Sequence, residues 1–169
     1  PLDDDQGKFD FLSMFEEIIQ VPPDKAKKYY RLAQNIRLDY YLFKSSTYKG
    51  TNYEVVFREV WDGQGNTERD DIQSALQINM RRISKIMNDL GTEETMDRWK
   101  GRPPIVRETG SNSQAGRKWE TTVYGELVGR CLFNQQGLEK VLHQIGQKMT
   151  SMPEETSDGI FEKAIGELY

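Results

Sequence analysis

Apolar residues recur at every third or fourth position in five stretches of this chain, and glycine- or proline-containing breaks separate the stretches. This spacing places the apolar side chains on one face of an amphipathic helix. It predicts helices from Phe9 to before Pro22, from Asp24 to about residue 43, from Thr67 to Leu90, from Asn134 to Met149, and from about Ser157 to Leu168. Gly91 is expected to end the third helix in a left-handed conformation.

A different pattern, alternation of apolar and polar residues, predicts three strands. The first covers residues 53–61, the second runs from Trp119 to Tyr124, and the third from Leu127 to Phe133, joined to the second across Gly125. We expect residues 108–116 to form a mobile loop, because they contain no apolar residue larger than alanine. Since strands and helices do not alternate steadily, we predict an α+β fold with a small antiparallel sheet of about three strands packed with about five helices.

The 169 residues are enough for one sizeable core, and we expect a single globular domain over residues 1–169. The chain starts with Pro1, so we expect a processed product or a domain excised from a larger protein. No stretch reaches the ~20 apolar residues that span a membrane. Cys131 is the single cysteine, which predicts an intracellular protein, cytoplasmic or nuclear, without a disulfide framework.

The net charge of −4 hides a strong alternation of charge along the chain. Residues 1–24 hold seven acids and one lysine, a net charge of −6. Residues 25–49 hold seven bases and one aspartate, a net charge of +6. Residues 98–118 hold six bases and one glutamate, a net charge of +5. The two basic segments are therefore the candidate binding regions.

The segment 98–118 combines bases and tryptophans with a glycine- and serine-containing loop. Cations can meet phosphates and indole rings can stack on bases, so this composition is typical of single-stranded nucleic-acid binding. The predicted contact residues are Arg98, Trp99, Lys100, Arg102, Arg107, Arg117, Lys118 and Trp119. The alternative is that Trp99 and Trp119 anchor the core and that the bases form a solvated rim.

A second basic face is predicted on the helix that starts at Asp24. Lys25, Lys28 and Arg31 are spaced to share one side of it and could contact a phosphate backbone. The favoured alternative is that this face pairs with the acidic first helix, or with the acidic end of another copy, since complementary neighbouring segments need no outside ligand.

Two segments of the chain resemble known binding motifs but lack residues that those motifs require. Residues 110–118 miss the phosphate-loop pattern, because five residues separate the glycines and Arg117 replaces the lysine. Residues 62–73 miss the calcium-loop pattern, with Thr67 for the glycine and Gln73 for the bidentate glutamate. The acids around Asp62 could in principle hold Mg²⁺ for a nuclease. We predict no metal site and no cofactor.

Cys131 and His143 have no local signature of a nucleophile and its base. A buried thiol and a surface histidine are the expected roles, so no catalytic residue is predicted. The sequence thus favours a non-enzymatic module that binds single-stranded nucleic acid, RNA included, or acts in a nucleoprotein assembly. The alternative is a protein-interaction or self-assembly domain, and a metal-dependent nuclease is the more distant one.

Overall fold

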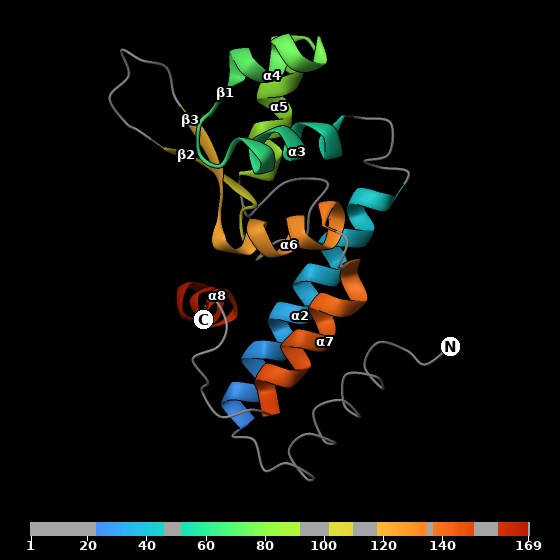
Figure 1. Cartoon of the computed structure of the whole chain (residues 1–169), viewed down its shortest axis with the longest axis vertical. Coiled ribbons are helices and arrows are strands. Elements are labelled where there is room, and N and C mark those ends of the chain that lie inside the picture. Colours follow the sequence, from blue (N-terminus) through green and yellow to red (C-terminus); the bar gives the residue numbers. More distant parts are fainter. Residues whose placement is uncertain are drawn as a thin grey trace.

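The computed structural model describes residues 23–45, 52–91, 102–109, 118–134, 137–150 and 159–168. This part of the chain contains seven helices and one three-stranded antiparallel sheet, which confirms the predicted α+β class (Figure 1). The helices are α2 (Pro23–Lys44), α3 (Tyr53–Gly63), α4 (Arg69–Leu76), α5 (Met80–Leu90), α6 (Val123–Phe133), α7 (Gly137–Thr150) and α8 (Ile160–Leu168). The strands are β1 (Thr67–Glu68), β2 (Val106–Thr109) and β3 (Lys118–Thr121).

The elements form two groups joined by α6. The long helices α2 and α7 run side by side, and both α6 and α8 pack against α2 (Figure 1). The sheet lies with α3, α4 and α5 on the other side of α6 (Figure 1). No described helix is long and apolar enough to cross a membrane.

The sheet is small, and β3 is its central strand. The strand order is β1-β3-β2, with both pairs antiparallel. Trp119 of β3 lies opposite Thr67 of β1 and opposite Glu108 of β2. Because strand side chains alternate between faces, Trp119 turns inward while its neighbours Lys118 and Glu120 are more accessible.

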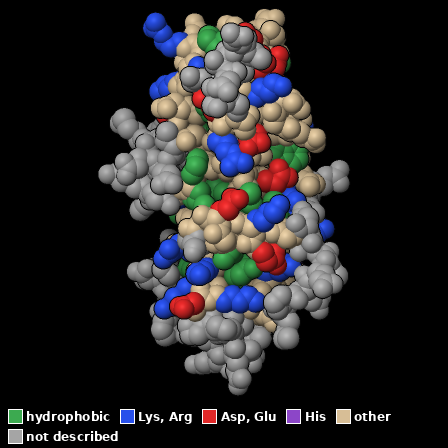
Figure 2. All heavy atoms as spheres, turned by 90° about the vertical axis from the view of Figure 1, so that its left-hand side faces the viewer, with side chains coloured by type: hydrophobic (Ala, Val, Ile, Leu, Met, Phe, Trp, Pro, Cys, Tyr) green, Lys and Arg blue, Asp and Glu red, His purple; other side chains and the backbone are tan. Residues whose placement is uncertain are grey.

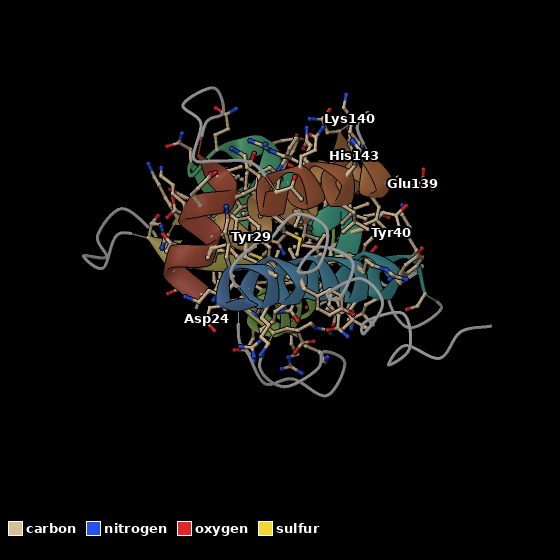
Figure 3. The ribbon with its side chains drawn as sticks, turned by 90° about the horizontal axis from the view of Figure 1, so that it is seen from below. Asp24, Tyr29, Tyr40, Glu139, Lys140 and His143 are labelled. Atoms are coloured by element: carbon tan, nitrogen blue, oxygen red, sulfur yellow. The ribbon has the colours of Figure 1, made fainter. Side chains whose placement is uncertain are left out.

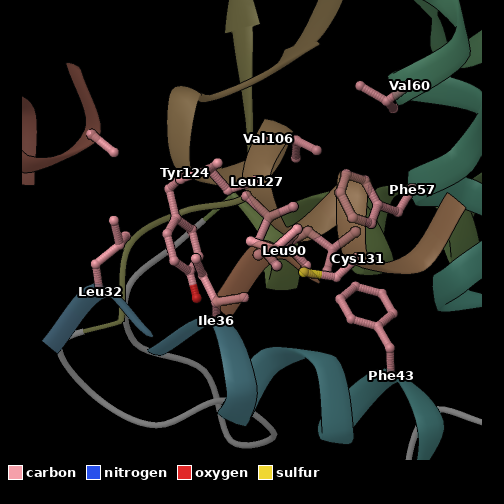
Figure 4. Packing of buried hydrophobic residues seen from close by; sticks show 14 of the residues in the cluster. Leu32, Ile36, Phe43, Phe57, Val60, Leu90, Val106, Tyr124, Leu127 and Cys131 are labelled. Carbon is pink, nitrogen blue, oxygen red and sulfur yellow. The ribbon is translucent and has the colours of Figure 1, made fainter. Parts of the chain in front are cut away.

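The core lies where α2 and α6 meet α3 and α5. Leu32, Ile36 and Phe43 of α2 face Leu127 and Cys131 of α6 across this interior (Figure 4). Phe43 also stacks on Phe57 of α3, with ring centroids 5.5 Å apart. The predicted helix over residues 24–43 is thus confirmed as α2, which buries one face at helical spacing.

The predicted strand over residues 53–61 is wrong, because these residues form α3. The buried residues of α3 are Tyr53, Val56, Phe57 and Val60, which follow helical spacing, while Val55 is exposed. Two of these four, Tyr53 and Phe57, also fit an alternating pattern. A run rich in aromatic and β-branched residues satisfied both periods, and packing against the core decided for the helix.

The predicted strand over residues 127–133 is also wrong, because residues 123–133 form α6. Thr122 caps this helix: its hydroxyl accepts a hydrogen bond from the Gly125 amide at 2.8 Å and donates to the Pro104 carbonyl at 2.7 Å. Gly125 therefore lies in the first turn of a helix rather than in a hairpin turn. The second predicted strand is confirmed only up to Thr121.

The predicted helix from Thr67 to Leu90 is broken into three elements. Thr67 belongs to β1, and the capping box of α4 uses Glu68 and Asp71. Gln77 then takes a left-handed conformation with φ of 53°, which ends α4. Gly91 does end α5, but its φ of −96° is not left-handed, contrary to the prediction.

The remaining differences concern element boundaries. Asn134 ends α6 instead of starting the next helix, and α7 begins at Gly137. Residues 106–109 form β2, which the sequence pattern did not predict. Glu108 and Thr109 belong to β2, so the predicted loop over residues 108–116 is wrong at its start. The rest of that loop and the predicted helix from Phe9 to before Pro22 lie outside the described residues.

The packing of α2 against α8 predicts a loss of stability at alkaline pH. Burial, and secondarily the nearby carboxylate of Glu162, raise the pKa of Tyr29 from 10.0 to about 12. The folded protein then keeps this proton up to about pH 12, whereas the unfolded chain loses it from about pH 10. The free energy of unfolding therefore keeps its full value below about pH 10. It falls as pH rises, by about 1.4 kcal/mol at pH 11.

Urea unfolding at pH 8 and pH 11 measures this effect in the wild type and in Tyr29→Phe, which cannot ionise at this position. We expect the variant to lose about 1.4 kcal/mol less stability than the wild type between the two pH values. Cys131, whose pKa burial raises to about 12, is present in both proteins and cancels in the comparison. Equal losses would show that the folded state does not hold the Tyr29 proton.

Candidate binding surface

The structure describes four of the eight residues of the predicted nucleic-acid site. Arg98, Trp99, Lys100 and Arg117 lie outside the described residues. Arg102 and Trp119 are buried, and Arg107 and Lys118 are exposed on β2 and β3. The described members of the set therefore do not form one continuous exposed surface.

Arg102 is a core residue with an internal partner. It is 3 % exposed, and its Nε lies 3.4 Å from Oδ1 of Asp39, which is 0 % exposed on α2. The Tyr124 hydroxyl of α6 donates a hydrogen bond to Oδ2 of the same carboxylate, and Figure 4 shows this hydroxyl pointing toward α2. A guanidinium buried in this ion pair is not available to a phosphate, so the expected contact role of Arg102 is corrected.

Trp119 also belongs to the core. It packs in the buried cluster, and the guanidinium of Arg69 lies over its ring at 5.5 Å from the centroid. Its ring is therefore not open to a nucleic-acid base in the described structure, which corrects its expected stacking role. The alternative interpretation, that Trp119 is a core anchor, describes its position.

The exposed bases of the sheet lie among acids. Arg107 Nε is 2.7 Å from Glu120 Oε1, and Arg69 Nη2 is 3.4 Å from Glu108 Oε1. With Lys118 and Glu68, the three strands and Arg69 carry three bases and three acids. Figure 2 shows basic and acidic side chains interspersed over this side of the molecule. Such exposed pairs contribute little stability, but they leave no net positive field on the sheet.

The opposite situation holds on α2, whose exposed charges beyond its first turn are basic. The single acid among residues 25–45 is Asp39, and it is buried against Arg102. Asp24 is exposed in the first turn. The exposed basic side chains of the helix are Lys27, Lys28, Arg31, Arg37 and Lys44, of which Lys44 pairs with Glu54 of α3 at 3.0 Å. Because this one aspartate is buried, the exposed charge of α2 is more positive than the net charge of its residues.

Two apolar side chains are exposed on the same helix. Leu38 is 38 % exposed and Tyr41 is 56 % exposed. They are three residues apart and continue the row of Lys27 and Arg31 at spacings of three and four residues through Gln34. We call the set Lys27, Lys28, Arg31, Arg37, Leu38, Tyr41 and Lys44 the basic face of α2.

The residues predicted for the second basic face are partly on this surface. Lys28 and Arg31 are exposed members of it, whereas Lys25 is half-buried with its ammonium 6.0 Å from the centre of the Tyr29 ring. Figure 3 shows α2 beside α7, with Lys140 and His143 on the side of α7 away from α2. Those side chains are therefore suitable positions for control substitutions.

The other candidate sites do not assemble in the described part of the chain. No group of three or more histidine, cysteine, aspartate or glutamate residues could hold a metal ion there. Asp62 pairs with Arg58, and Asp71 serves the capping box of α4. Cys131 is buried on α6 with its pKa raised to about 12, so its thiol is protonated at neutral pH, and His143 is exposed on α7.

No family model, curated protein or solved structure matches this chain. The exposed side chains of the described residues are therefore the indication of what this chain binds.

Leu38 and Tyr41 are candidate functional residues that the sequence interpretation missed. The sequence pattern singled out neither residue, although it placed both within the predicted helix from Asp24 to about residue 43. A signal was present in the sequence, because Leu38 and Tyr41 lie at helical spacing from the bases Lys27 and Arg31. Apolar residues on the basic side of an amphipathic helix are expected to be exposed.

Proposed function

We propose that this chain is a non-enzymatic binding module that holds an acidic, amphipathic segment of a protein partner on the basic face of α2. The observation that carries the proposal is one row along α2 on which the exposed bases Lys27 and Arg31 are followed by the exposed apolar side chains of Leu38 and Tyr41. The lone, buried Cys131 supports a reducing setting, so we place the module in the cytoplasm or nucleus.

The apolar members of the face favour protein over nucleic acid as the ligand. A phosphate backbone would satisfy the cations, and Tyr41 could stack on a base. Leu38, however, is aliphatic and gains most from burial against another apolar side chain. An acidic helix with one apolar stripe would meet both kinds of side chain at once, as in helix recognition on a groove or face.

Fluorescence anisotropy with a labelled, designed peptide tests this proposal. The peptide places glutamates and leucines at helical spacing, and a scrambled peptide of equal composition is the reference. We expect the designed peptide to bind, and Leu38→Gln with Tyr41→Gln to weaken binding by at least about tenfold, because apolar burial is lost. The charge reversals Lys27→Glu with Arg37→Glu are expected to weaken it similarly.

The matched control reverses the same number of charges elsewhere. Arg81→Glu with Lys140→Glu changes one exposed base on α5 and one on α7, and it should leave peptide binding unchanged. Equal weakening by both pairs of reversals would mean that only net charge matters. No binding of the designed peptide, or equal binding of the scrambled one, would contradict the proposal.

Single-stranded nucleic acid remains the second candidate ligand, alone or within a nucleoprotein assembly. The observation in its favour is that Arg107 and Lys118 are both exposed on neighbouring strands. Arg98, Trp99, Lys100 and Arg117 would join them under this proposal. The same assay with single-stranded RNA and DNA at two salt concentrations tests it, because phosphate contacts weaken steeply with salt. Absent or salt-independent binding would exclude this candidate.

A further inference from the structure

The residues that precede α2 have the opposite character to its basic face. Residues 1–22 carry six acids and one lysine, a net charge of −5. Their apolar residues Phe9, Leu12, Phe15, Ile18 and Ile19 follow helical spacing. We propose that the basic face of α2 binds residues 1–22 of a second copy of this chain. This inference rests on the proposed function, since it names the partner of the same surface.

Charge complementarity is the first argument for this occupant. The face presents five bases, and its helix has no exposed acid after Asp24. Residues 1–22 supply six carboxylates, the last two at Glu16 and Glu17 within the predicted amphipathic segment. Opposed fields of this kind speed association and select a partner, and like charges would keep two α2 faces apart.

The apolar residues give the second argument. Leu38 and Tyr41 are exposed beside these bases, and residues 9–19 offer an apolar stripe between acids. An interface that joins apolar contacts to surrounding ion pairs is typical of stable protein association. Neither the acids alone nor the apolar stripe alone would match the whole face.

The short link between residues 9–19 and α2 favours a second copy, rather than the same copy, as the source of the acidic segment. The helix that the sequence predicts over residues 9–19 would be about 16 Å long, and a link of three residues before Pro23 would set it along the first half of α2 of its own copy. Leu38 lies about 22 Å and Tyr41 about 27 Å from the start of α2. Folding back would thus set the apolar stripe against Lys27, Lys28 and Arg31. In a second copy, the stripe is free to lie on Leu38 and Tyr41.

The proposed contact between two copies is reciprocal, so it forms a closed dimer. Each copy has one face and one acidic segment, so two copies can satisfy both contacts around a two-fold axis. The expected product is a dimer rather than an open chain.

Light scattering on the full-length chain over a range of concentrations tests the inference. We expect the mass to rise from one chain to two as concentration increases. A face variant, Leu38→Gln with Tyr41→Gln, and a segment variant, Leu12→Gln with Phe15→Gln, should each remain monomeric at concentrations where the wild type is dimeric. An equimolar mixture of the two variants retains one intact face and one intact segment, and its mass should rise again.

The outcomes separate this inference from the proposed function. A wild-type chain that stays monomeric but binds the designed acidic peptide would overturn the second-copy inference and leave the proposed function standing. A chain that neither dimerises nor binds the peptide would contradict both. A dimer that survives in both variants would place the contact on another surface and overturn the inference. Circular dichroism of each variant checks that its helices remain formed.

Discussion

Replacing Asp39 by alanine is expected to lower the free energy of unfolding by about 3–5 kcal/mol. The substitution leaves the Arg102 guanidinium buried without its carboxylate, and it removes the acceptor of the Tyr124 hydroxyl. An unpaired charge in the interior costs far more than the net contribution of the intact pair. Chemical denaturation with the slope held in common measures the change.

Two further variants show whether the charge is the cause. Asp39→Leu combined with Arg102→Met removes both charges, and it should recover most of the lost stability. Arg37→Ala changes an exposed residue on the same helix and should stay within about 0.5 kcal/mol of the wild type. A loss below about 1 kcal/mol in Asp39→Ala would mean that Arg102 finds water when its partner is removed.

Gly125→Ala is expected to destabilise the fold by about 2–3 kcal/mol or more. A Cβ at this position would lie 1.9 Å from the Ile105 carbonyl oxygen and 3.2 Å from Thr122 Oγ1. The obstacle is backbone, and the same carbonyl already accepts a hydrogen bond from the Thr122 amide at 3.0 Å. It cannot move without disturbing the cap of α6. Thermal or urea unfolding gives the change directly.

Gly146→Ala is the matched control, because Gly146 also lies within a helix but has no atom within 4 Å of the added Cβ. Alanine is the better helix former, so this variant should gain up to about 1 kcal/mol. The two substitutions are chemically identical and are expected to change stability in opposite directions. Destabilisation of similar size at both positions would contradict the close approach of α6 to Ile105.

The helices were predictable where the apolar residues of a segment follow only the helical period. In α2 and α7 the apolar residues repeat at three and four positions for several turns, which a strand cannot satisfy. In Tyr53–Gly63, Tyr53 and Phe57 fit both periods, and packing against the tertiary core decides for the helix. The break at Gln77 has no glycine or proline to mark it, since a non-glycine residue takes the left-handed conformation there.

The binding surface was less predictable, because burial decides which charges are visible. Arg102 and Asp39 lie 63 positions apart in the chain, and no local pattern indicates that they form one buried pair. That pair takes a base from the segment 98–118 and the single acid from the segment 25–49. The pair therefore removes one base from the exposed charge of the segment 98–118 and the one acid from the exposed charge of the segment 25–49. The candidate binding surface is accordingly on α2.

Chemical-shift mapping by NMR tests most directly whether the basic face of α2 is the binding surface. The ¹⁵N-labelled chain is titrated with the designed acidic peptide, and the amide shifts are followed residue by residue. The proposed function predicts that the largest changes fall along α2, at Lys27, Arg31, Leu38 and Tyr41. Changes centred instead on Arg107 and Lys118, with α2 unaffected, would contradict it.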